Sequence, residues 1–122
     1  MLEPVNLSAA FARFTDAWSP KVVGDVNDMQ VKVARFRGDF VWHRHEAEDE
    51  LFLVHRGRMV MRLRDRELVL GPGELLIVPR GVEHCPGALD GECEVVLFEP
   101  RATLNTGDAE DPRTVRAPER LA

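Results

Sequence analysis

Two histidines and a carboxylate near the middle of the chain could bind one metal ion together. His43 and His45 are separated by a single residue, so on an extended strand both side chains lie on the same face. Glu50 follows after four further residues, close enough for a short bend to bring its carboxylate to the same point. Imidazole and carboxylate ligands favour zinc, iron, manganese, cobalt or nickel over calcium and magnesium, which prefer oxygen ligands alone. This stretch therefore predicts three ligands of a site for one divalent transition metal.

A fourth ligand is predicted in a second segment, residues 73–84. The apolar run between Gly73 and Pro79 predicts a buried strand, and the Pro-Arg-Gly sequence that ends at Gly81 predicts a turn. His84 would then be the first inward residue of the next strand. We therefore expect His84 to complete the metal site.

The two segments resemble the two sequence motifs of the cupin superfamily. The first motif is matched by Gly38, His43, His45, Glu50 and Gly57, with Gly38 one residue later than in the family. The second motif is matched by Gly73, Pro79, Gly81 and His84, while Ala88 stands where the family has an Asn that is not a metal ligand. The resemblance implies a small single-domain cupin, that is, a double-stranded β-helix or jelly-roll barrel with the metal in its mouth or interior.

Length and charge restrict the classes of function. A chain of 122 residues can bury the core of one domain but is too short for two. Its formal net charge of -5 disfavours binding to a phosphate backbone, so we expect a small-molecule ligand or substrate and no nucleic acid. No apolar run has the length of a membrane span, and residues 1–4 lack the features of a signal peptide. We therefore expect a cytoplasmic protein without a membrane partner.

The hydrophobic pattern predicts an all-β domain after one short helix. Apolar residues at helical spacing predict an amphipathic helix over 6–18, and strands are expected at 21–26 and 29–36, around a turn at 27–28. Further short strands follow up to residue 99, the last of them after a hairpin turn at Asp90-Gly91. This pattern alone fits a sandwich or a closed barrel, and the resemblance favours the barrel. The expected parts are an N-terminal helix and lead-in (1–20), the barrel (21–100) and a C-terminal tail or arm (101–122). The sequence does not decide whether this last segment is a disordered tail or an arm that lies along the barrel or a neighbour.

Alternation within the strands predicts which side chains face inward. Val31 and Val33 are expected on the buried face of their strand, and the intervening Lys32 on its polar face. Beyond the bend that follows His45, Phe52 should lie inside with Glu50.

Three other features have simple interpretations. Cys85 and Cys93 flank the expected hairpin turn and are expected to be reduced, with a disulfide as the alternative. His55 is expected at the surface or at an interface, without a metal. The arginines of residues 58–64 predict a solvated face that pairs with acidic side chains, with an anion site as the alternative.

Two functions from different classes remain open. The chain could be a small-molecule metalloenzyme, as dioxygenases, isomerases and lyases of the superfamily are, with the metal as Lewis acid or redox centre and Glu50 also able to act as a base. It could instead be a metal-dependent binding or sensing module without turnover, which the absence of Tyr fits. A phosphosugar isomerase would need a cationic cluster near the metal. The candidates for that cluster are Arg35, Arg37, Arg44 and Arg80.

The expected substrate pocket is apolar, so the substrate should have an apolar part. Its predicted walls are Phe36, Val41, Phe52 and Leu97, for each of which core packing is the alternative.

Outward apolar side chains suggest how the chain associates. Trp42, Leu51 and Leu53 are expected to face outward, where such side chains are costly to leave in water. We therefore expect a homodimer.

Overall fold

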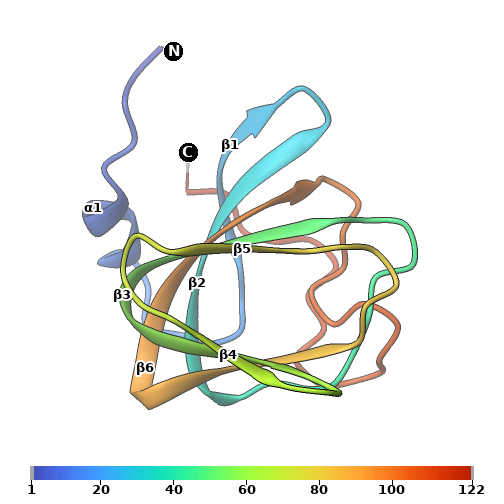
Figure 1. Cartoon of the computed structure of the whole chain (residues 1–122). Helices are drawn as coiled ribbons and strands as arrows, with labels where there is room; N and C mark the ends of the chain where they lie inside the picture. Colours follow the sequence, from blue (N-terminus) through green and yellow to red (C-terminus); the bar gives the residue numbers. More distant parts are fainter. Residues whose placement is uncertain (1, 122) are drawn as a thin grey trace.

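Strands dominate the computed structural model, which describes residues 2–121 (Figure 1). The elements are α1 (Leu7–Phe11), β1 (Lys21–Val26), β2 (Met29–Asp39), β3 (Glu50–Leu63), β4 (Glu67–Leu70), β5 (Leu75–Val78) and β6 (His84–Pro100). All strand pairs are antiparallel, in the order β1-β2-β6-β3-β4, and β5 pairs with β3. The sheet curls over on itself, as in a jelly-roll barrel, so the predicted fold class is confirmed.

The long strands β3 and β6 bend together, which lets the sheet close. The first part of β3 pairs with β5 and its second part with β4, while β6 follows both parts. The bend lies at Gly57, whose φ of +81° favours glycine. A Cβ at this position would come within 2.8 Å of the Glu92 carbonyl oxygen, so a larger residue would push the two strands apart.

The predicted hairpin at Asp90-Gly91 is wrong, because β6 runs through it. Asp90 and Gly91 have φ values of +56° and +105°, but the strand on either side keeps the same neighbour: Leu89 pairs with Arg58 and Glu94 with Arg56. The two residues form an irregularity within one strand, not a reversal. The cysteines on either side, at positions 85 and 93, are both buried and both free.

The N-terminal helix is shorter than predicted. Asn6 caps α1 by accepting a hydrogen bond from the Ala9 amide, but the helix ends at Phe11 instead of near residue 18. Beyond it, the Trp18 amide donates to the Arg35 carbonyl at 2.8 Å. In a longer helix the Trp18 amide would donate to a carbonyl of the helix itself. Here it pairs with the edge of β2 instead. Within residues 2–121 no helix is long and apolar enough to cross a membrane.

The inward and outward faces of β2 are the reverse of the prediction. Lys32, Ala34 and Phe36 point into the barrel, whereas Val33 faces outward and is nevertheless fully buried because α1 covers it. Both faces of β2 are covered, so alternation alone could not distinguish them. On β3 the prediction is confirmed, since Phe52 is buried on the same side as Glu50.

Two further expectations about burial have opposite outcomes. The strand expected to be buried, β5, lies at the edge of the sheet, and its Leu75 and Ile77 are 56% and 54% exposed. The arginines on β3 are solvated and paired with acidic groups as predicted, for example Arg58 with Asp90.

After Pro100 the chain lies along the barrel as an arm (residues 101–121). The amide of Leu121 donates to the Val22 carbonyl and the Val22 amide to Glu119, which ties the far end of the arm to β1. Nearer its start, Thr103 and Thr106 are buried. These contacts join positions about a hundred residues apart, so no local pattern in the sequence announces them.

Candidate metal centre

The four predicted ligands meet inside the barrel. One ligand atom from each of His43, His45, Glu50 and His84 lies within 4.8 Å of all the others, and all four side chains are buried. The Glu50 Oε1 atom is 3.1 Å from His45 Nε2 and 3.6 Å from His84 Nε2. The spacing of the two motifs therefore predicts a real cluster of side chains.

Backbone pairing brings the ligands together from three parts of the chain. His43 and His84 form an antiparallel bridge, in which each amide donates to the other's carbonyl at 3.0 and 2.9 Å. The carbonyl of His45 accepts a hydrogen bond from the Gly81 amide at 2.8 Å, so the turn before β6 supports the first motif. Glu50 begins β3 and points to the same interior.

Two of the imidazoles are oriented for metal binding by backbone carbonyls. The Nδ1 atoms of His43 and His84 each lie 2.9 Å from a carbonyl two residues earlier, that of Val41 and that of Val82. A carbonyl only accepts, so Nδ1 must carry the hydrogen and Nε2 keeps its lone pair. Such a bond on the far nitrogen is the usual way of fixing a histidine that binds a metal.

The cluster contains buried polar atoms without hydrogen-bond partners. They include both ring nitrogens of His45, Oε1 of Glu50 and Nε2 of His84. Buried acceptors that lack a partner destabilise a folded protein, and a divalent cation among them would satisfy several at once. Three imidazoles and one carboxylate also form a donor set that transition metals prefer. The residues therefore fit such an ion.

Burial and mutual contact set the charges of the cluster. Burial, together with the neighbouring His84, lowers the pKa of His43 to about 4, so its ring is neutral at neutral pH. For His45, burial alone would lower the pKa, but the neighbouring Glu50 carboxylate raises it. Burial would raise the pKa of Glu50, yet the neighbouring Glu99, His45 and His84 side chains hold it well below its usual range. Glu50 thus contributes a negative charge to the cluster.

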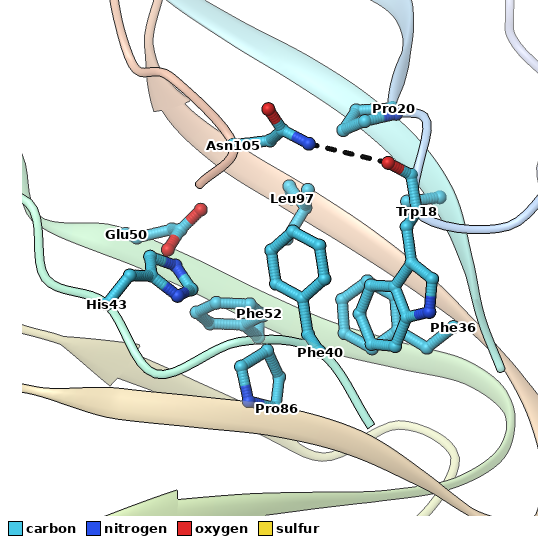
Figure 2. Close-up of a pocket in the computed structure, with 11 residues that line it drawn as sticks. Trp18, Pro20, Phe36, Phe40, His43, Glu50, Phe52, Pro86, Leu97 and Asn105 are labelled. Carbon is cyan, nitrogen blue, oxygen red and sulfur yellow. Dashed lines mark hydrogen bonds between the residues drawn. The ribbon is translucent and has the colours of Figure 1, made fainter. Parts of the chain in front are cut away.

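An apolar cavity opens beside His43 and Glu50 (Figure 2). Trp18 stacks on Phe36 and on Phe40, with ring centroids 4.4 and 4.5 Å apart. The cavity is small, with a volume of about 30 Å³. The remaining lining residues are Pro20, Ala34, Phe52, Pro86, Leu97 and Asn105.

Three of the four predicted pocket walls line this cavity, and the fourth does not. Phe36, Phe52 and Leu97 contribute side chains, but Phe40 takes the place expected for Val41. Residues 40–42 have no strand geometry, so the alternation that linked Val41 to His43 fails there. Val41 instead serves through its carbonyl, as the partner of His43.

The four arginines considered for a phosphate site are bound elsewhere. None of the four is among the described residues that line the cavity. Arg35 lies against Glu94 at 3.3 Å, Arg37 against Glu92 at 2.8 Å, Arg44 against Glu46 at 2.8 Å and Arg80 against Asp49 at 3.4 Å. The cationic cluster that a phosphosugar isomerase would need is therefore not formed by these residues.

The arm contributes contacts that the sequence did not suggest. Asn105 lines the cavity, and its Nδ2 donates to the carbonyls of Trp18 and Arg113. The Asp108 side chain accepts a hydrogen bond from the Arg44 amide at 2.9 Å, between the two first histidines. In the sequence these contacts correspond only to an Asn and an Asp in a stretch without hydrophobic periodicity. Such residues are too common in loops to predict a contact.

Two charged residues inside the barrel were also missed. Lys32 Nζ and Glu99 Oε1 form an ion pair at 2.9 Å, and both side chains are almost fully buried. The available signals were one charged residue inside the apolar run 31–34 and another directly after the apolar run 95–98.

Comparison with known proteins agrees with the motifs. A family model described as a cupin domain matches residues 31–99. The protein YdbB of Bacillus subtilis (strain 168) is 38% identical over 63 residues, 51% of this chain and 56% of that protein, so the match spans little more than half of the relative's length.

Solved structures are similar over most of the chain. A crystal structure of a cupin-2 domain protein from Shewanella frigidimarina is 40% identical, with a TM-score of 0.77 over 80% of this chain and 94% of that one. Protein NMB1881 of Neisseria meningitidis is 27% identical, with a TM-score of 0.73 over 80% and 99% of the two chains. The motifs, the barrel and these matches together show that the chain belongs to the cupin family.

Proposed function

We propose that this chain is a metalloenzyme that binds one divalent transition-metal ion through His43, His45, Glu50 and His84. Its substrate would be a small, largely apolar molecule. The observation that carries the proposal is the buried cluster of four side chains whose ligand atoms lie within 4.8 Å of one another, beside an apolar cavity. Three of these side chains, those of His45, Glu50 and His84, carry buried polar atoms without hydrogen-bond partners.

The side chains of this chain would have distinct roles. The three histidines and Glu50 hold the ion, which when bound supplies Lewis-acid or redox chemistry. The Nδ1 bonds of His43 and His84 keep their rings in the orientation that binding needs. The aromatic wall around Trp18 and Phe36 excludes water and packs against the apolar part of the substrate.

Glu50 is proposed as a ligand first and as a base second. A carboxylate whose pKa is held well below its usual range is a good anionic ligand but a weak proton acceptor. A base role would therefore require that its contacts with His45 and Glu99 change when substrate binds.

A metal-dependent binding module is the second candidate. The cavity is small, about 30 Å³, and its one side-chain amide, that of Asn105, already donates to the carbonyls of Trp18 and Arg113 and accepts from the Val115 amide. Among the described residues that line it, His43 and Glu50 alone are ionisable, and both are assigned to the metal. A site without a free acid or base suits binding better than proton transfer.

Metal content tests the metal site. Untagged protein is analysed by mass spectrometry beside the variants His84→Ala and Glu50→Ala, after each has been offered zinc, iron and cobalt. We expect about one ion per chain in the parent and loss of it in both variants. His55→Ala is the control, because His55 stacks on Phe11 outside the cluster and should keep the ion. A parent protein that takes up no metal would sink the proposal.

Substrate screening separates the two candidates. The metal-loaded protein is incubated with keto acids, diketones and phosphosugars, and both its unfolding temperature and the products are measured. Product formation that is lost in His84→Ala supports the enzyme. A raised unfolding temperature without product, for any compound of the panel, supports the binding module.

A further inference from the structure

A buried ion pair connects the barrel wall to the predicted ligand Glu50. Lys32 on β2 and Glu99 on β6 both point into the barrel, and each residue is 1% exposed. Their side chains meet at 2.9 Å through Lys32 Nζ and Glu99 Oε1. Among the described residues, Glu99 is the one ion-pair partner of Lys32.

The Glu99 carboxyl group also lies next to Glu50. Glu99 Oε2 is buried and has no hydrogen-bond partner among the described residues. The register of β3 and β6, in which Leu51 pairs with Phe98, brings Glu99 beside Glu50. The other side of Glu50 faces His45 and His84. Glu50 is therefore held between the histidines and Glu99, and Glu99 is held by Lys32.

Packing alone does not explain this pair. Removing an ammonium and a carboxylate from water costs several kcal/mol each, and replacing such a pair with apolar side chains of similar volume is often neutral or stabilising. The neighbours on the same inward face, Ala34 and Leu97, show that apolar residues are accepted there. The buried pair thus lowers the stability of the fold relative to apolar residues, and its neighbour with a proposed role is Glu50.

We propose that Lys32 and Glu99 are positioning residues, which fix the Glu50 carboxylate toward the metal and so set the affinity and coordination geometry of the site. The proposal rests on the metal binding proposed above. Lys32 anchors Glu99, Glu99 limits the rotation of Glu50, and the oxygen that faces the histidines stays available to the ion. A residue one contact away from a ligand typically changes metal affinity by about 10- to 100-fold when it is replaced.

Cobalt binding tests this role, because the visible spectrum of bound Co²⁺ reports its coordination geometry. The affinity for Co²⁺, measured by competition with a chelator, and its spectrum are compared in the parent, Lys32→Met and Glu99→Gln. The double variant Lys32→Met with Glu99→Leu replaces the whole pair by apolar residues and so should fold. We expect affinity to fall by about 10- to 100-fold and the Co²⁺ bands to shift in all three.

Lys21→Met is the matched control. Lys21 is also a buried lysine in an ion pair, 2.8 Å from Asp16, but its partners are in the segment before β1 and at the end of the arm. It should lose stability without any change in Co²⁺ affinity or spectrum. Unfolding temperatures of the metal-free proteins are recorded beside these values, so that loss of fold is not mistaken for loss of positioning.

The outcomes distinguish the two proposals. A parent that binds Co²⁺, together with a folded double variant of the same affinity and spectrum, overturns the positioning role and leaves the metal site standing. A parent that binds no Co²⁺ overturns the metal site and the positioning role with it.

Discussion

Gly107 lies directly against His43. A Cβ at position 107 would come within 3.0 Å of the Cδ2 atom of the His43 ring and would overlap the carbonyl oxygen of Arg44. The arm is therefore in contact with a predicted metal ligand, and only a residue without a side chain fits at that point. Its φ of +57° adds a second reason for glycine.

Gly107→Ala is expected to destabilise the protein and to weaken metal binding. The left-handed conformation alone costs about 1–2 kcal/mol for alanine, and the overlap with Arg44 adds to this cost. Gly38→Ala is the control, because Gly38 has a φ of +66° but open space around its Cβ position. Denaturant unfolding should show a larger loss for Gly107→Ala; equal losses would contradict the contact.

Leu97→Ala is expected to cost about 2–5 kcal/mol of folding free energy, because it removes a buried side chain from the cavity wall and enlarges the cavity. Leu75→Ala is the matched change on the exposed strand β5, where we expect a change within about 0.5 kcal/mol. Benzene, offered as an apolar probe, should raise the unfolding temperature of Leu97→Ala but not of Leu75→Ala. Equal losses in both variants would argue against Leu97 as a cavity wall.

The thiol of Cys93 is expected to stay protonated at pH values well above those at which a free thiol titrates. Burial, together with Glu92 and Glu94, raises its pKa from 9.0 to about 12. Between these values the unfolded chain has lost a proton that the folded chain keeps, so the free energy of unfolding should fall as pH rises. Denaturant unfolding at several pH values in this window measures the fall, which Cys93→Ala should reduce.

The thiolate can also be followed directly by its ultraviolet absorbance. The chain contains no Tyr, so no phenolate absorbs in the same pH range. We expect little thiolate signal from the folded protein at about pH 9 and a clear rise on unfolding, because free thiols titrate near this pH. A full thiolate signal from the folded protein at that pH would contradict the burial of both cysteines.

The homodimer remains a prediction, and the structure changes the residues that support it. Leu53 packs partly against the core under α1, and Trp42 lies beneath the Arg64 guanidinium, 3.8 Å from the ring centroid. Ile77, opposite Leu51 in the register of β5 and β3, is more than half exposed. Apolar surface on an edge strand favours association.

Light scattering tests this prediction. We expect the parent to have twice the mass of the 13.8 kDa chain and Ile77→Lys to have the mass of one chain. Val69→Lys is the control on β4, since Val69 is equally exposed, at 54%. A parent of single-chain mass would refute the dimer.

The cluster of four side chains could be predicted from sequence because residues close to each ligand in the chain restrict where its side chain can lie. The single residue between His43 and His45, and the short bend before Glu50, restrict where those side chains can lie, and the turn before His84 does the same. On β3, alternation correctly placed Phe52 inside with Glu50 because the strand is regular there.

The errors arose where distant segments decide the outcome. Lys32 was predicted to face solvent, since nothing near it in sequence announces Glu99 on the neighbouring strand or α1 on the other face. The helix was predicted to reach residue 18, because the buried Trp18 has helical spacing from Phe11 although it is held by β2. Val41 was misplaced because residues 40–42 leave strand geometry just before the site.

The arm and the barrel are expected to unfold locally at different free energies. The strands share long ladders of backbone hydrogen bonds, whereas the arm is held by isolated contacts such as the two hydrogen bonds between Asp108 and Arg44 and the one from Leu121 to Val22. Segments that no ladder of backbone hydrogen bonds stabilises open at lower free energy than the core does. Amide hydrogens of residues 103–109 should therefore exchange with solvent water sooner than those of β6, and each such opening uncovers the cavity while the barrel stays folded.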